Sequence, residues 1–110
     1  MSKQALVPIA DGTEEIEAVT IIDLLRRAGV EVTVASVSDQ ATLQITAARG
    51  TYIVADAAIE SCSEQSWDLI AVPGGVEGAE ALASCDTLDK LLRKQASEGR
   101  LFAAICAAPA

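Results

Sequence analysis

Short apolar runs alternate along the chain with segments whose apolar residues recur at helical spacing. Residues 5–10 form an apolar run, residues 30–37 alternate and are rich in β-branched side chains, and Ile16, Val19 and Ile22 lie between them. The runs predict buried strands, and the spacing of three to four residues predicts a helix. A strand, a helix and a strand in this order favour a right-handed parallel crossover.

The predicted helix has signals at both ends. Residues 11–13, Asp-Gly-Thr, are expected to supply a turn and the helix N-cap. The first turn carries carboxylates, which the helix dipole favours: Glu14, Glu15 and Glu17. We interpret Glu14 and Glu15 only as partners of this dipole. Residues 26–27, both arginine, followed by Gly29, mark the end of the helix.

The middle of the chain predicts smaller elements. Residues 43–47 and 51–55 are short β-prone runs on either side of Ala48-Arg49-Gly50, which indicates a hairpin at or beside the edge of the sheet. Residues 56–66 are polar and irregular, with room for one helical turn. No element beyond that turn is expected there.

The last third repeats the pattern of strands and helices. Residues 69–72 are a continuous apolar strand closed by Pro73-Gly74-Gly75, and residues 78–83 predict a short helix. A second helix follows and ends at Gly99; its cap is one of three residues, Ser84, Cys85 or Asp86. Residues 101–105 form the final predicted strand, which leads directly to Cys106.

Composition indicates one α/β domain over residues 1–110. The chain is 51% hydrophobic but has only three aromatic residues, so its core is built from aliphatic side chains. Such a composition suits a parallel sheet covered on both faces. A chain of 110 residues is long enough for one continuous core and too short for two.

Charge and residue usage exclude several classes of function. The net charge of −8, without a Lys/Arg cluster, disfavours nucleic acid and anionic membrane surfaces as partners. No apolar run approaches the roughly 20 residues of a membrane span and no signal-peptide pattern is present, so we expect a cytoplasmic protein. The three cysteines, Cys62, Cys85 and Cys106, lack C-x-x-C spacing and the chain has no histidine, so neither a disulfide framework nor a metal site is expected.

Three predicted loops converge on one edge of the sheet. If the strands at 5–10, 69–72 and 101–105 are parallel neighbours, the residues after them share one crevice. These residues are the acidic start of the first helix, the Gly74-Gly75 pair and Cys106. The crevice is the predicted site.

Each of these residues has a chemical reason to be at such a site. Gly74 and Gly75 lack a Cβ, so their N–H groups, with that of Ala107, are suited to bind an oxyanion. Cys106 at a strand-to-helix turn has its thiolate favoured by the helix N-terminus. A carboxylate beside a thiolate is unfavourable unless one of the two keeps a proton, so we expect Glu17 and Cys106 to share one.

The ordinary interpretation of each residue is different. A buried cysteine is more often a small core residue than a nucleophile. A Gly-Gly pair usually marks a tight turn, and Arg26, Arg27 and Arg49 would ordinarily be solvated. Cys62 and Cys85 are in polar, loop-like surroundings in the sequence, and we expect no role for them. Only the combination of residues at one edge favours a catalytic site.

Four segments resemble the ThiJ/PfpI family, in its ThiJ/YajL branch, which includes the parkinsonism-associated protein deglycases. They are residues 12–19 (GTEEIEAV), 25–30 (LRRAGV), 72–75 (VPGG) and 103–109 (AAICAAP). The resemblance spans the chain in order. It implies a flavodoxin-like, three-layer α/β sandwich with a mostly parallel sheet, of the class I glutamine amidotransferase-like superfamily.

The resemblance also implies roles for individual residues. Cys106 matches the family's oxidation-sensitive nucleophile on a strained elbow, and Glu17 matches the protonated glutamate that hydrogen-bonds its sulfur. Gly75 and Ala107 match the backbone donors of the oxyanion site. Two arginines, Arg27 and Arg49, match residues that line the family's site near the dimer contact.

For function, the resemblance implies a cofactor-free glyoxalase or deglycase that acts on small reactive carbonyls, such as methylglyoxal, or on glycated protein. It also implies a homodimer. The alternative is a redox sensor or a chaperone in oxidative stress that uses Cys106 without turnover. Family members continue well past this length and carry a histidine near the cysteine, so we expect the chain to be an N-terminal fragment, with the enzyme activity belonging to the intact protein.

Overall fold

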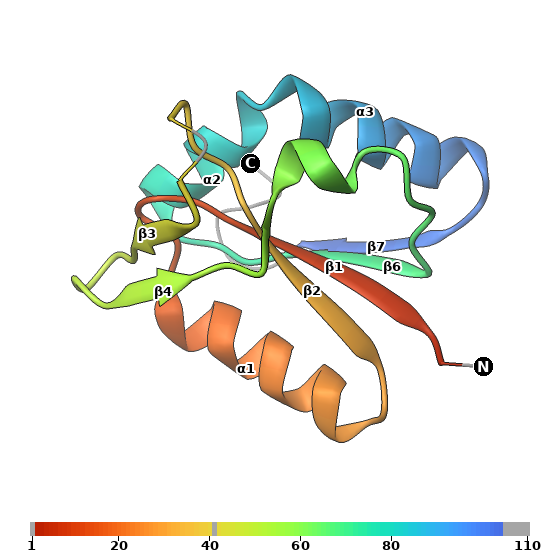
Figure 1. The fold of residues 1–110 in the computed structure, drawn as a ribbon, viewed down its shortest axis with the longest axis horizontal. Coiled ribbons are helices and arrows are strands. Elements are labelled where there is room, and N and C mark those ends of the chain that lie inside the picture. Colours follow the sequence, from red (N-terminus) through yellow and green to blue (C-terminus); the bar gives the residue numbers. More distant parts are fainter. Residues whose placement is uncertain (1, 41, 105–110) are drawn as a thin grey trace.

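The computed structural model describes residues 2–40 and 42–104 and shows a parallel sheet between two layers of helices (Figure 1). The five strands lie in the order β5-β2-β1-β6-β7, and all of their pairings are parallel. Their bounds are Gln4–Ile9 (β1), Glu31–Ser36 (β2), Ala57–Ala58 (β5), Leu69–Val72 (β6) and Leu101–Ala104 (β7). The predicted three-layer α/β fold with a mostly parallel sheet is confirmed.

The helices and a hairpin cover the two faces of the sheet. One face carries α1 (Glu15–Arg27), beside the antiparallel hairpin of β3 (Gln44–Thr46) and β4 (Tyr52–Val54). The other face carries α2 (Val76–Ala83), α3 (Asp86–Ser97) and the short 3-10 helix η1 (Ile59–Cys62). The predicted hairpin is therefore present, and it forms a separate two-stranded sheet.

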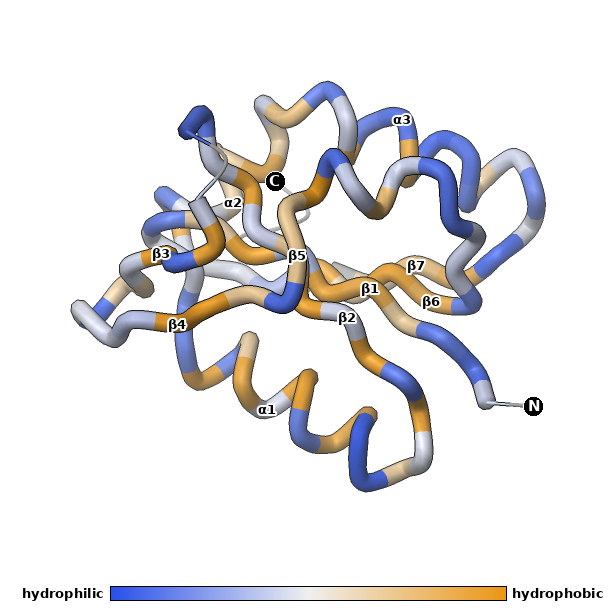
Figure 2. Tube along the Cα trace, viewed as in Figure 1, coloured by the Kyte–Doolittle hydropathy of each residue, from blue (hydrophilic) through white to orange (hydrophobic). Residues whose placement is uncertain are grey.

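The central strands are buried on both faces, which explains their continuous apolar sequence (Figure 2). In β1, Leu6 packs into the core under α2, α3 and η1, whereas Val7 packs into the core under α1 and the hairpin. Trp67, just before β6, is almost fully buried, and its indole N–H donates to the carbonyl of Cys62 at 3.3 Å.

Pro8 lies in this central strand although it has no N–H to donate. Successive residues of a strand direct their backbone N–H groups to opposite neighbouring strands, and the direction at position 8 explains why proline is tolerated there. Gln4 bonds towards β6, since its carbonyl accepts from the Asp68 N–H at 2.8 Å, and every second residue of the strand faces the same way. The position of the missing N–H therefore faces β6, where the paired register ends at Leu6 and Ile70.

Three details differ from the sequence-based expectations. The N-cap of α1 is Glu14, whose side chain accepts from the Ile16 N–H, and not a residue of the turn at 11–13. The prediction of polar surroundings for two cysteines is wrong: Cys62 is 4% exposed in the core and Cys85 packs against the same cluster. β5 was not predicted, because two alanines carry no periodicity.

Within the described residues, no helix is both long and apolar enough to cross a membrane.

Candidate functional site

Two loops meet at the carboxyl edge of the sheet and are locked together by reciprocal hydrogen bonds. The Glu14 N–H donates to the carbonyl of Gly74 at 3.0 Å, and the Gly74 N–H donates to Oε1 of Glu17 at 2.9 Å. The helix that follows β1 thus holds the loop that follows β6. Its half-buried carboxyl group, Glu17, lies where the sequence predicts the site.

Glycines make this close approach possible. Gly75 has φ +97°, and a Cβ on it would lie 2.5 Å from the carbonyl oxygen of Gly12. Gly78, in the first turn of α2, would bring a Cβ to 2.6 Å from the Cα of Thr13. Side chains at these positions would force the two loops apart. Gly75 and Gly78 are therefore required because there is no space for a Cβ at either position. At Gly75 the left-handed backbone conformation also favours glycine.

Thr13 holds the inner part of the β1–α1 loop. It is fully buried, its N–H donates to the carbonyl of Ala10 at 3.0 Å, and its Oγ1 accepts from the Ala10 N–H at 2.9 Å. This reciprocal pair closes the turn that the sequence assigned to residues 11–13. The hydroxyl stabilises the turn rather than capping α1.

A cavity of about 360 Å³ opens between these loops and the turn that joins β3 to β4. It is lined by Gly12, Glu14, Glu17, Ala48, Arg49, Gly75, Val76 and Glu77. Arg49 brings a positive charge to a wall that otherwise carries carboxylates, and its guanidinium lies 3.8 Å from Glu14. A cavity of this size admits a small molecule, and Glu17 forms part of its wall.

The hairpin reaches this cavity because its base is tied to the β1–α1 loop. The Thr46 N–H donates to Oδ1 of Asp11 at 2.9 Å, and the Thr46 carbonyl accepts from the Gly12 N–H at 2.9 Å. The Ala48 N–H donates to the carbonyl of Thr13 at 2.8 Å. Residues far apart in the sequence thereby form one wall.

The structure brings together four of the predicted site residues: Glu17, Gly74, Gly75 and Arg49. Arg27 lies at the opposite end of α1, is exposed, and pairs with Asp23 at 3.0 Å. Cys106 and Ala107 lie outside the described residues. The Gly74 N–H, which the sequence predicts as an oxyanion donor, instead donates to Glu17.

Sequence reasoning missed two contributors. Glu14 lines the cavity and pairs with Arg49, and Glu15 contacts the hairpin, although both were interpreted as dipole partners only. Their position at the start of a helix that follows a strand was a weak signal that they lie near the predicted crevice. No local pattern indicates that the hairpin docks onto them.

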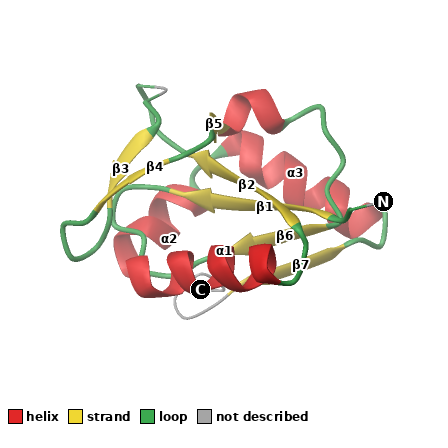
Figure 3. Cartoon of the chain, turned by 60° about the horizontal axis from the view of Figure 1, so that its bottom comes forward, coloured by secondary structure: helices red, strands yellow, loops and turns green. Residues whose placement is uncertain are grey.

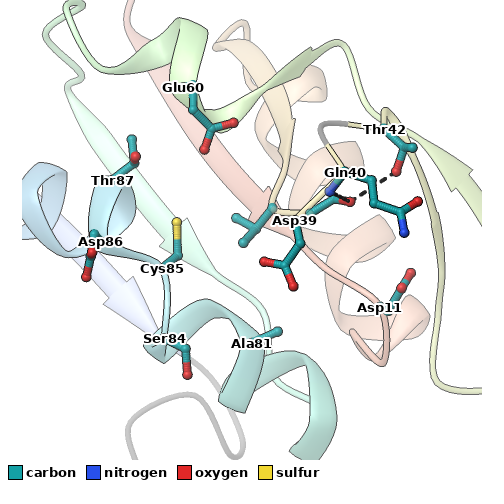
Figure 4. Close-up of a pocket in the computed structure, with 12 residues that line it drawn as sticks. Asp11, Asp39, Gln40, Thr42, Glu60, Ala81, Ser84, Cys85, Asp86 and Thr87 are labelled. Atoms are coloured by element: carbon teal, nitrogen blue, oxygen red, sulfur yellow. Dashed lines mark hydrogen bonds between the residues drawn. The ribbon is translucent and has the colours of Figure 1, made fainter.

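A larger cavity, of about 550 Å³, is lined by Asp11 of the β1–α1 loop together with residues that follow β2 and residues at the start of α3 (Figure 4). Its wall is acidic, with Asp11, Asp39 and Glu60, and it includes the Cys85 thiol. That thiol caps α3, since its sulfur accepts from the Leu88 N–H at 3.5 Å. The part of the chain that the structure describes contains no cluster of side chains suited to a metal ion.

The arrangement of layers in Figure 3 and the parallel order of the central strands define a class: flavodoxin-like α/β proteins, a fold in which ligands generally bind at the carboxyl ends of the strands. Within this class, the profile of the DJ-1/PfpI family matches residues 3–110. The chain belongs to the DJ-1/PfpI family.

Individual relatives agree with this assignment. The chain is 48% identical to protein DJ-1 homolog B of Arabidopsis thaliana over 99% of its own length and 24% of that protein's. It is 37% identical to the glutathione-independent glyoxalase DJR-1.2 of Caenorhabditis elegans, covering 97% of the chain and 56% of the relative. The structure of oxidized Toxoplasma gondii DJ-1 superposes with a TM-score of 0.95 at 46% identity, covering 98% of the chain and 58% of that structure. The chain therefore spans between 24% and 58% of the length of these proteins.

Proposed function

We propose that the protein containing this chain is a cysteine-dependent enzyme of the glyoxalase or deglycase type, acting on small reactive carbonyls such as methylglyoxal or their adducts. The contact between Glu17 and Gly74 at the end of β6 carries the proposal. In the paired register Val72 lies opposite Ala104, and Gly74 and Cys106 each follow two residues later. On this proposal the Cys106 thiol lies near the Glu17 carboxyl group.

The proposed reaction begins with attack of the Cys106 thiolate on the aldehyde carbon. A carbon–sulfur bond forms and the carbonyl oxygen takes up negative charge, which the N–H groups of Gly75 and Ala107 stabilise. Glu17 accepts the thiol proton and returns a proton in a later step, while the Gly74 N–H orients its carboxyl group. A hydrogen shift from the former aldehyde carbon to its neighbouring carbon converts the adduct to a thioester, and water then cleaves the carbon–sulfur bond, which releases lactate and the thiol. Methylglyoxal and water together have the composition of lactic acid, so turnover requires no external oxidant or reductant.

Two substitutions in the full-length protein test this function. Cys106→Ser is expected to abolish conversion of methylglyoxal to lactate, and Glu17→Gln is expected to lower kcat by about 10²-fold or more, the usual contribution of a proton-transfer group. Cys85→Ser is the matched control, because this thiol caps α3 away from the cavity of Glu17. Turnover that persists in Cys106→Ser would refute the proposed mechanism.

A second candidate is a redox sensor in which Cys106 is oxidised by a peroxide to sulfenic and then sulfinic acid. The relative from Toxoplasma gondii was solved in an oxidized form, which favours this candidate. In such a role Glu17 donates a hydrogen bond to the oxidised sulfur. Intact-mass measurement after peroxide treatment, combined with the methylglyoxal assay on the untreated protein, separates the two candidates, since a sensor adds oxygen to Cys106 without turning over methylglyoxal.

We also propose a homodimer. Large apolar side chains are exposed on α1 at Ile16 and Leu24, and on β4 at Tyr52 and Val54. These elements lie on the same side of the sheet, and apolar patches of this kind mark protein interfaces. Sedimentation equilibrium of the full-length protein tests the assembly, and a monomer at micromolar concentration would contradict it.

A further inference from the structure

The carboxylate of Glu15 reaches from the first turn of α1 to the turn between β3 and β4. Its Oε1 and Oε2 lie 3.1 and 3.0 Å from the backbone nitrogen of Arg49, and Oε2 lies 3.4 Å from that of Thr51. One side chain therefore accepts hydrogen bonds from two N–H groups of the turn. Such charge-assisted bonds to backbone are stronger than neutral ones.

The turn held in this way is a wall of the Glu17 cavity. Ala48 and Arg49 line the cavity, and the guanidinium of Arg49 points to the carboxylate of Glu14, 3.8 Å away. Two consecutive glutamates thus hold the same arginine: Glu15 binds the backbone N–H of Arg49, and Glu14 pairs with its guanidinium. A shift of the turn would move both the wall and its positive charge.

The ionised form of Glu15 is the form that the structure stabilises. Its pKa lies below the ordinary value of 4.5, first because its own backbone N–H donates to it and, against the opposing effect of burial, because Arg49 and Thr51 donate as well. The carboxylate therefore accepts these bonds throughout the neutral range.

We propose that Glu15 is a positioning residue of the site: it holds the β3–β4 turn against α1, so that Ala48 and Arg49 close one side of the cavity around a small carbonyl substrate. The inference rests on the proposed function, to which it adds a residue that touches no reacting atom. The base of the hairpin has its own ties, through Asp11 and Thr13, so removing the Glu15 carboxylate loosens the tip and leaves the fold intact.

The experiment compares the full-length wild-type protein with Glu15→Gln, and with Asp89→Asn as a control that also removes an exposed helical carboxylate. In Glu15→Gln, hydrogen exchange at the amides of Arg49 and Thr51 is expected to rise about 10-fold, while exchange at the Thr46 amide stays unchanged. KM for methylglyoxal is expected to rise about 3- to 10-fold with kcat within about twofold of wild type. Glu15→Asp, which keeps the charge, is expected to recover part of the loss.

Each outcome decides the proposal. Unchanged exchange at Arg49 and Thr51 would show that Glu15 does not hold the turn, whatever the turnover. Faster exchange with an unchanged KM would reduce Glu15 to a local contact and overturn its positioning role. A wild-type protein without turnover refutes the proposed function instead, and the rate of Cys106 alkylation by neutral iodoacetamide then decides: a faster rate in Glu15→Gln supports the proposal, and equal rates overturn it.

Discussion

Glu17 and Gly74, 57 positions apart in the sequence, share a hydrogen bond of 2.9 Å in which the backbone amide donates to the carboxyl oxygen. Gly74 is buried and Glu17 is half-buried, so water does not readily replace the acceptor. The bond joins α1 to the end of β6. It fixes both the acid and the loop that the proposed chemistry needs.

Removal of this acceptor is expected to destabilise the protein. Glu17→Ala leaves the Gly74 N–H without its partner and should lower the free energy of unfolding by about 1–3 kcal/mol. Glu17→Gln keeps an oxygen that can accept the bond, so its loss should be clearly smaller. Urea denaturation of the full-length variants measures both. Equal losses in the two variants would show that the bond to Gly74 contributes nothing to stability.

Three glycines, two at the site and one after the far end of α1, separate two physical requirements: backbone conformation and space for a Cβ. Gly29→Ala tests conformation alone, because Gly29 has φ +84° and open space around it, and should cost about 1–2 kcal/mol. Gly78→Ala tests space alone and should cost about 1–3 kcal/mol by overpacking against Thr13. Gly75→Ala combines both and should cost more than either variant.

Thermal and urea unfolding give this ranking directly. Gly75→Ala should also reduce turnover in the full-length protein, since the loops that hold Glu17 are forced apart. If Gly75→Ala were no more destabilising than Gly29→Ala, the loops would have moved apart without loss of stability, which would contradict the requirement for space at Gly75.

The periodicity of apolar residues along the sequence was enough to predict most of the strands and helices. The apolar run at 69–72 matches β6, and the helical spacing from Ile16 onward matches α1, because burial on both faces or on one face imposes these patterns locally. Glu17 was predicted from its place in the first turns of the helix that follows the first strand. The parallel order of β1, β6 and β7 then confirmed the shared edge.

Hydrogen bonds between residues far apart in the sequence could not be predicted from the local pattern of apolar and polar residues. Asp11 and Glu15 bond to a hairpin more than thirty positions away, and nothing in residues 43–55 shows which surface the hairpin covers. The cap of α1 was assigned to the turn at 11–13, whereas Thr13 bonds back to Ala10. In each case a polar side chain had several possible hydrogen-bond partners, and the partner it has in the structure is determined by tertiary packing.

Thr13 is expected to stabilise the protein through its hydroxyl. Thr13→Val keeps the shape but leaves the buried Ala10 N–H without an acceptor, so the free energy of unfolding should fall by about 1–3 kcal/mol. Thr13→Ser keeps the hydroxyl and loses one methyl group, at a cost of about 1 kcal/mol. A Val variant as stable as wild type would contradict the role of this bond.

The two described cysteines should differ in reactivity. Cys62 is 4% exposed, and burial raises the pKa of its thiol above the ordinary value, whereas Cys85 is half-buried and lines an open cavity. At neutral pH, iodoacetamide should therefore modify Cys85 at least about 10-fold faster than Cys62. Peptide mass spectrometry resolves the two sites, and denaturant should remove most of the difference. Equal rates in the folded protein would contradict the burial of Cys62.

The stabilising effect of Glu15 should depend on pH with a definite sign. Because the pKa of Glu15 is lower in the folded protein than its ordinary value of 4.5, the folded state favours the ionised form. Its contribution is therefore fully present above about pH 4.5 and is lost as the pH falls through the lower, folded value. Wild type should be more stable than Glu15→Gln at neutral pH, and the difference should shrink between pH 4.5 and more acid conditions. Urea denaturation of both proteins as a function of pH measures it, with Asp89→Asn as the control. A constant difference across this range would mean that the charge of Glu15 does not hold the turn.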